Sequence, residues 1–263
     1  MTTLRAIFAH HVGTRPEVRT VSAQDLRFAL AKGVEDFLAM PTHVLFVIAI
    51  YPVAGLIIAT VTFEQDLIPL LFPLASGFAL VGPFAAIGLY ELSRRRAEGL
   101  DPNWARAYAP LRTHASGPIL AVGLLLTAIF LAWLVAAMGL YWTLYGTDRP
   151  ETILGFVADV LTTARGWALI VVGNLVGFAF SLLALAISVI SLPMLVDRNV
   201  EALAAIETSL DAVRTSPRTF LMWGFIVAGL LVAGMLPLFV GLAVVLPILG
   251  HATWHLYRRT IAP

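Results

Sequence analysis

Two histidines and two arginines lie close together in the C-terminal stretch LPILGHATWHLYRR, residues 246–259. On a helix, His251, Trp254, His255 and Arg258 fall at i, i+3, i+4 and i+7 and therefore share one face. Histidines four residues apart can bind a metal ion. The same residue types are typical of a helix end anchored among lipid headgroups. We favour this anchoring interpretation and keep His251 and His255 as weak metal candidates.

Haem is a weaker hypothesis, because two axial ligands must approach the iron from opposite sides and these histidines lie on one face. His43, at the same level of another expected span, is the alternative second ligand. We therefore expect no cofactor and keep haem or a divalent metal as alternatives.

Carboxylates are expected near the same depth as these histidines. Glu91 lies at the end of an apolar run, where an ionisable residue is a functional candidate by default. Its simpler interpretation is an ion pair with one of the arginines at 94–96. We hypothesise a polar cluster on the cytoplasmic floor of the protein, which consists of Glu91, Asp197, Glu201, His251 and His255.

The composition is that of an integral membrane protein. Of the 263 residues, 59% are hydrophobic and 13% charged, and the mean hydropathy is +0.88, whereas soluble proteins have about a quarter charged residues. The absence of cysteine excludes disulfides and thiolate catalysis. Serine-nucleophile, phosphate-loop, HExxH and dinucleotide motifs are also absent, so we do not expect an enzyme.

Continuous apolar runs predict an all-α polytopic fold with six transmembrane helices arranged as three hairpins. The expected spans are 42–63, 67–92, 119–141, 166–195 and two within 219–257. Each hairpin follows an amphipathic helix on the cytoplasmic surface, which the sequence places in 22–40, 101–116 and 198–216. We expect residues 1–20 to be a flexible cytoplasmic segment, 21–259 a single membrane domain and 260–263 a tail.

Basic residues predict the orientation. Fifteen of the 17 lie on the segments assigned to the cytoplasm, and Arg149 and Arg165 lie on the outer loop. This split predicts a multi-pass protein of the bacterial inner membrane with both termini in the cytoplasm. Its expected partners are the bilayer and other membrane subunits, with no nucleic acid. The residues assigned to lipid contact and topology are Arg94, Arg95, Arg96, Trp254, Tyr257, Arg258 and Arg259.

Two longer patterns concern packing. The order surface helix, proline, outgoing span and returning span occurs three times, with prolines at 83, 193 and 247, and it indicates either a repeat or the general preference of bilayers for such hairpins. Small or polar residues recur about every 3.5 positions in the fourth span, which predicts a helix-packing seam. The seam consists of Asn174, Gly177, Ser181, Ala184, Ser188 and Ser191. Asn174 has two interpretations, an interhelical hydrogen bond or the lining of a pathway.

The stretches GFALVGPFAAIGLYELSRRRAEG, SLPMLVDRNVEALAAIETSLDAVRTSP and LPILGHATWHLYRR together resemble a family of bacterial inner-membrane proteins catalogued as a domain of unknown function. The resemblance covers about residues 20–259, and the closing GHATWHLYRR is its most specific part. It implies a polytopic inner-membrane protein and no particular activity.

Three functions are open at this stage. The first is a non-catalytic accessory or assembly subunit of a larger membrane complex, such as a respiratory one, which the packing seam favours. The second is a small transporter or channel built from hairpin repeats. The third is a metal- or haem-binding membrane protein that uses His251 and His255.

Overall fold

The structure is a computed structural model that describes residues 16–40, 69, 73, 86–113, 115–146, 152–237 and 240–262. Its secondary structure there is helical, as predicted. The helices are α2 (Ala23–Ala39), α5 (Ile87–Ala97), α6 (Trp104–Ala107), the 3-10 turn η2 (Ala109–Arg112), α7 (Ser116–Tyr145), α8 (Ile153–Thr162), α9 (Ala164–Ser188), α10 (Ser191–Asp197), α11 (Ala202–Thr215), α12 (Pro217–Met235) and α13 (Leu242–Thr260). The first predicted span and most of the second lie outside the described residues.

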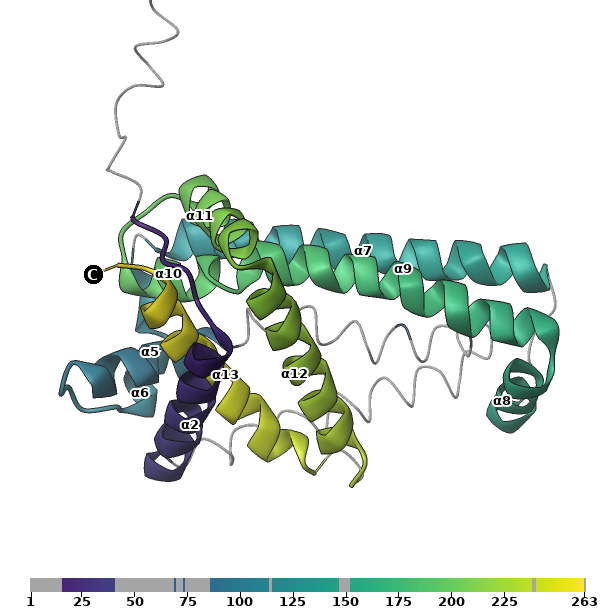
Figure 1. Ribbon diagram of the computed structural model, residues 1–263, viewed down its shortest axis with the longest axis horizontal. Helices are drawn as coiled ribbons and strands as arrows, with labels where there is room; N and C mark the ends of the chain where they lie inside the picture. The colour runs from purple at the N-terminus through teal and green to yellow at the C-terminus, as the bar shows by residue number, and fades with distance from the viewer. Residues whose placement is uncertain are drawn as a thin grey trace, which may run out of the picture.

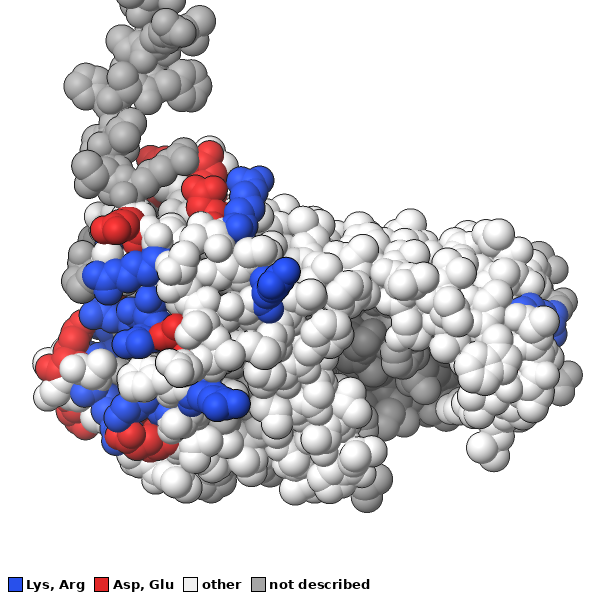
Figure 2. Space-filling view, in the orientation of Figure 1, with Lys and Arg blue, Asp and Glu red and all other residues white. Residues whose placement is uncertain are grey.

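The helices form a charged end and an apolar arm. α7 and α9 run side by side as a long arm, and α8 lies across its far end (Figure 1). At the other end, α2, α5, α6, α11 and the C-terminal half of α13 gather together, and we call this group the charged end. Lys, Arg, Asp and Glu side chains concentrate there, whereas the visible face of the arm is almost free of charge (Figure 2).

Among the residues that the structure describes, three helical segments are long and apolar enough to cross a membrane, namely Ser116–Tyr145, Ala164–Asp197 and Pro217–Met235. They coincide with the third, fourth and fifth predicted spans. α13 follows a turn after α12, as predicted, but the second half of its 19 residues carries histidines and arginines. It is not among the candidate spans, so the six-span arrangement is not confirmed. α12 also diverges from the arm rather than running parallel to it (Figure 1).

The predicted surface helices differ from one another in the structure. α2 begins with the expected capping box of Ser22 and Asp25, in which the Ser22 backbone N–H donates to the Asp25 carboxylate over 2.9 Å. The second is only the single turn α6, capped by Asn103 rather than by Asp101. α11 exposes Leu203 of its apolar face. Its buried residues are Ala205, Thr208, Ser209 and Ala212.

This difference bears on the threefold repeat. α2 packs on α13, α11 packs on α9, and α6 packs on α5. The three helices therefore have unlike neighbours, although the first outgoing span lies outside the described residues. The repeat remains a prediction.

The buried stripe of α2 consists of Leu26, Ala29, Gly33 and Asp36. Leu38, near the C-terminal end of α2, is 76% exposed. A Cβ on Gly33 would lie 2.7 Å from the Ile248 carbonyl oxygen and 2.8 Å from the Ala252 Cβ. The missing side chain therefore allows the two backbones to approach closely, as small residues do at helix crossings. α2 packs against α13 rather than lying free on the membrane surface.

The two ends of the described chain pair with each other. Val18 and Ile261 form an antiparallel bridge, and the Arg19 N–H donates to the Thr260 carbonyl over 2.7 Å. The Val21 N–H donates to the buried Ser216 hydroxyl over 3.0 Å. Residues 16–20 and 260–262 are therefore in contact with each other and with the helical part of the chain, and the expected boundaries at residues 20 and 260 stay a prediction.

The close approach at Gly33 can be tested with alanine. We expect Gly33→Ala to destabilise the protein by about 1–3 kcal/mol, because the added methyl group meets backbone atoms that cannot move independently. The matched control is Gly139→Ala on α7. A Cβ there would meet no atom of the part of the chain that the structure describes within 4 Å, so alanine should be neutral or stabilising by up to about 1 kcal/mol. Thermal unfolding in mild detergent measures both. Equal melting temperatures for the two variants would contradict the packing argument.

Candidate functional site

The most developed polar site surrounds Asp36, the last member of the buried stripe of α2. Its carboxylate is 2% exposed. It accepts a hydrogen bond from the Ser93 hydroxyl of α5 over 2.6 Å and contacts Nε2 of His255 on α13 over 2.8 Å. It also forms an ion pair with Arg96 of α5. One carboxylate therefore joins three helices that are distant in the sequence.

Two opposing effects act on the pKa of Asp36. Burial raises it, because a carboxylate loses its hydration. The hydrogen bonds from His255, Ser93 and Arg96, together with the charge of His255, outweigh burial and lower the pKa from 3.8 to about 2. Asp36 is therefore ionised at neutral pH, and these donors compensate its burial.

A second histidine extends this network into the protein. Nδ1 of His251, which is fully buried, lies 2.7 Å from the Ser93 hydroxyl oxygen. The hydroxyl has one proton, and we assign it to the bond with Asp36 because a carboxylate can only accept. His251 then donates from Nδ1 to Ser93, so that Nε2 carries a lone pair. Among the described residues, Nε2 of His251 and Nε1 of Trp254 are buried without a hydrogen-bond partner.

This arrangement contains Ser, His and Asp but is not a hydrolytic triad. In a triad the imidazole lies between the carboxylate and the hydroxyl. Here the Ser93 hydroxyl lies between Asp36 and His251, and Ser93 is 1% exposed. The geometry suits a structural hydrogen-bond network, which we call the Asp36 network and define as Asp36, Ser93, Arg96, His251 and His255.

The carboxylates expected beside the histidines have other partners. Glu91, which is 2% exposed, accepts two hydrogen bonds of 2.8 Å from Arg94. This contact is the ion pair with an arginine of residues 94–96 that the sequence analysis gave as the simpler interpretation of Glu91. Asp197 accepts from the Tyr257 hydroxyl over 2.6 Å and from Arg258 over 3.2 Å.

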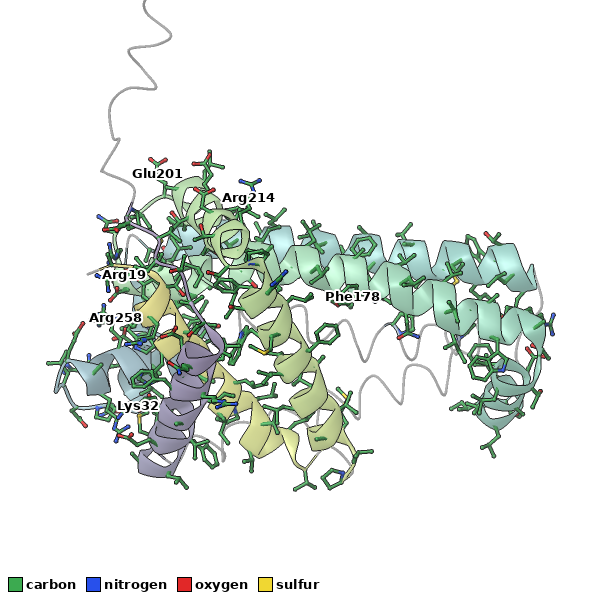
Figure 3. The ribbon with its side chains drawn as sticks, in the orientation of Figure 1. Arg19, Lys32, Phe178, Glu201, Arg214 and Arg258 are labelled. Atoms are coloured by element: carbon green, nitrogen blue, oxygen red, sulfur yellow. The ribbon has the colours of Figure 1, made fainter. Side chains whose placement is uncertain are left out.

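Glu201, the remaining carboxylate of the hypothesised cluster, is exposed. It lies beside α11, away from the labelled Arg258 (Figure 3). The structure therefore distributes the hypothesised cluster over separate places and brings Asp36, which the sequence hypothesis omitted, to His255.

The anchoring interpretation of the C-terminal stretch is wrong for its most apolar members. His251, Trp254 and Tyr257 are 0–1% exposed, because α2 and α5 cover this part of α13. Arg95 is also nearly buried, and its Nε donates to the Asp101 carbonyl over 2.8 Å. The residues left partly exposed for headgroup contact are Arg94, Arg96, Arg258 and Arg259.

A metal hypothesis gains little from this geometry. Within the part of the chain that the structure describes, no group of three or more His, Cys, Asp or Glu residues could hold a metal ion. His251 and His255 each use one ring nitrogen for the network, through Ser93 and Asp36 respectively. The remaining nitrogens are the only ones they could offer to a ligand.

The predicted packing seam of α9 is half correct. Ala184, Ser188 and Ser191 are buried, and a Cβ on Gly177 would lie 3.0 Å from the Trp133 ring of α7. Ser181 and Asn174, however, are exposed. The seam is thus buried near the charged end, whereas Ser181 and Asn174 are exposed on a part of α9 that still packs on α7.

The polar cluster predicted from the sequence did not include Asp36 or Ser93, although the sequence contains a signal for Asp36. Leu26, Ala29, Gly33 and Asp36 follow steps of three and four, so the carboxylate continues a stripe of small and apolar residues. A charge on such a stripe requires a buried partner. No comparable signal identifies Ser93.

Removing the charge of Asp36 should be costly. We expect Asp36→Asn to lower stability by about 3–5 kcal/mol at pH 7, because Arg96 and His255 lose a buried partner. The adjacent Glu35→Gln is the control, since Glu35 is 50% exposed and should change stability by less than about 1 kcal/mol. The two variants are compared by thermal and denaturant unfolding in detergent.

The sign of the pH dependence follows from the lowered pKa. The folded state binds a proton at Asp36 less readily than the unfolded state, so the contribution of the ionised group is complete above about pH 4 and is lost as pH falls toward 2. The stability difference between wild type and Asp36→Asn should therefore shrink below pH 4. A difference that stays constant between pH 6 and pH 3 would show that the charge of Asp36 is not the stabilising feature.

The corrected seam predicts unequal tolerance of leucine on α9. Ser188→Leu should lower the melting temperature markedly, because this side chain is 1% exposed and lies against other helices. Ser181→Leu is the matched control on the exposed part of the same helix and should have little effect. If both variants melt alike, Ser188 does not lie at a close helix contact.

Comparison with known proteins is consistent with this architecture. Residues 71–197 match a family described as a predicted integral membrane protein (DUF2189). The match confirms the resemblance to an uncharacterised membrane family but does not extend to the C-terminal stretch. No curated protein and no solved structure matches the chain. The protein is a membrane protein of unknown function, and its residues 71–197 correspond to this predicted integral membrane protein family.

Proposed function

We propose that the protein is a non-catalytic component of the bacterial inner membrane that acts as an accessory or assembly subunit of a larger membrane complex. Two features support the proposal. The buried ionisable residues of the Asp36 network are engaged in contacts between α2, α5 and α13. One apolar span also leaves a face that is suited to another helix.

That face belongs to α12 and is the observation that carries the proposal. Only 17% of its apolar window is buried, compared with 33% and 39% for the other two candidate spans. Gly229 and Ala233 lie one turn apart on the exposed side, between the exposed Phe225 and Leu236. A Cβ on Gly229 would meet no atom of the described residues within 4 Å. Small residues one turn apart let a second transmembrane helix approach closely, whereas lipid needs no such notch.

The orientation is part of the proposal. Basic side chains gather at the charged end (Figure 2), which under the positive-inside rule belongs in the cytoplasm. The bridge between Val18 and Ile261 supports a common side for both termini. A partner would therefore meet α12 within the bilayer and the charged end on the cytoplasmic side.

The experiment is purification of the tagged protein from its native membrane in a mild detergent, followed by native electrophoresis and mass spectrometry. We expect stoichiometric partner subunits with wild type and about ten-fold lower partner recovery with Gly229→Leu, because the leucine fills the notch. Gly139→Leu is the control. Gly139 is also an exposed glycine with open space, but Val135 and Thr143 flank it at one-turn spacing.

Both variants should melt like wild type, which separates loss of a partner from loss of the fold. A wild-type protein that purifies as a monomer or as an oligomer of itself alone would contradict an accessory role. Equal partner recovery with the two leucine variants would show that α12 is not the contact face.

A further inference from the structure

A cavity of about 400 Å³ lies in the apolar arm, between α7, α8 and α9. Trp133 and Tyr141 of α7, Phe156 of α8 and Gly173 and Asn174 of α9 line it, and Pro69 and Pro73 complete the wall. The Trp133 indole N–H donates to the Pro73 carbonyl over 3.3 Å, which ties this wall to α7. The volume falls within the range of small-molecule sites, about 300–1,000 Å³.

The walls determine what charge an occupant can carry. None of the described residues that line the cavity is charged, and all except Asn174 and Tyr141 have apolar side chains. A charged group placed there would lose its hydration without an ionic partner. The part of any occupant inside the cavity is therefore uncharged and mainly hydrocarbon.

Asn174 gives the cavity one polar point. It lies ten residues into α9, about 15 Å from the start of that helix, which is half of the ~30 Å hydrocarbon thickness. One of its amide N–H groups donates to the Ile170 carbonyl of its own helix over 2.7 Å. Among the described residues this is the only hydrogen bond of the Asn174 side chain. Its second N–H and its carbonyl oxygen can therefore serve an occupant.

A polar side chain such as that of Asn174, midway across the hydrocarbon layer, requires a hydrogen-bond partner. The predicted interhelical hydrogen bond of Asn174 is not formed among the described residues, and the side chain lines the cavity instead. An amide in apolar surroundings is disfavoured unless it is hydrogen-bonded. An occupant with a single uncharged hydrogen-bonding group would satisfy it, whereas a plain hydrocarbon chain would not.

We propose that this cavity binds an uncharged amphiphile, in which a long apolar chain fills the aromatic part and one hydroxyl or carbonyl group hydrogen-bonds to Asn174. The aromatic part is built by Tyr141 and Phe156, whose rings lie 6.0 Å apart, and by Trp133. The amphiphile enters from the bilayer, where such molecules are concentrated. The acyl tail of a charged phospholipid is the competing occupant, and it has no group for Asn174.

Two matched probes distinguish these occupants. The full-length protein in lipid nanodiscs is exposed to a photoreactive hexadecanol and to the corresponding photoreactive hexadecane, and the labelled peptides are identified by mass spectrometry. We expect the alcohol to label peptides within 133–174 about ten-fold more than the hydrocarbon does. Equal labelling by the two probes would show a site for acyl chains only and would overturn the proposal, as would no labelling of these peptides.

Variants assign the binding to this cavity. Asn174→Leu should reduce labelling by the alcohol about ten-fold, to the level of the hydrocarbon. Gly173→Leu should reduce labelling by both probes, because its side chain fills the cavity, and a Cβ there makes only an ordinary contact of 3.6 Å with Leu140. Leu175→Ala, at a residue that is 64% exposed, is the control and should label like wild type.

Thermal unfolding shows that each variant remains folded. Preferential labelling by the alcohol that survives Asn174→Leu would contradict the role of the amide. Labelling that survives Gly173→Leu would place the bound molecule outside the cavity.

Discussion

The close contact of α2 with α13 is the constraint on which the charged end depends. Gly33 lets the α2 backbone lie against Ile248 and Ala252, and Asp36 follows three residues later on the same stripe. The carboxylate is therefore placed one turn beyond the point of closest approach, beside His255 of α13. A larger residue at position 33 would separate the helices, and the same separation would take Asp36 away from its partners.

The Asp36 network shows how a buried charge is accommodated. Three donors, from Ser93, Arg96 and His255, surround one carboxylate, and they outweigh the desolvation that would otherwise raise its pKa. Since the donors belong to α5 and α13, the charge can be satisfied only when α2, α5 and α13 are assembled. A buried ion pair of this kind contributes little net stability relative to an apolar core, but its partners are costly to separate. The network therefore selects one arrangement of the three helices.

The apolar arm follows different rules. Its helices are held by van der Waals contacts, such as that of Gly177 with the Trp133 ring, because helices in lipid gain nothing from burying hydrocarbon. Packing is close near the charged end, where Ser188 is buried. Farther out α7 and α9 stay in contact, and α8 crosses the end of the arm, where Phe156 of α8 and Asn174 of α9 line the cavity.

The sequence alone determined the features that depend on local composition and periodicity. Long apolar runs predicted the spans of α7, α9 and α12 because a bilayer requires about 20 such residues in succession. The capping box predicted the start of α2 because Ser22 and Asp25 interact within a single turn. The family resemblance, which rests on residue order, was likewise visible in the chain and is confirmed over 71–197.

Only the tertiary structure decided which face of each helix is covered. His251, Trp254 and Tyr257 are residue types that are typical of a lipid anchor. They are buried because α2 and α5 pack over this part of α13. Asp36 and His255 are separated by 219 residues, so periodicity within one helix cannot pair them. Ser181 and Ser188 belong to one stripe, yet the neighbouring segments leave the first exposed and cover the second. Helical periodicity shows which residues share one face of a helix. Which segment covers that face depends on how parts of the chain that are distant in the sequence pack together.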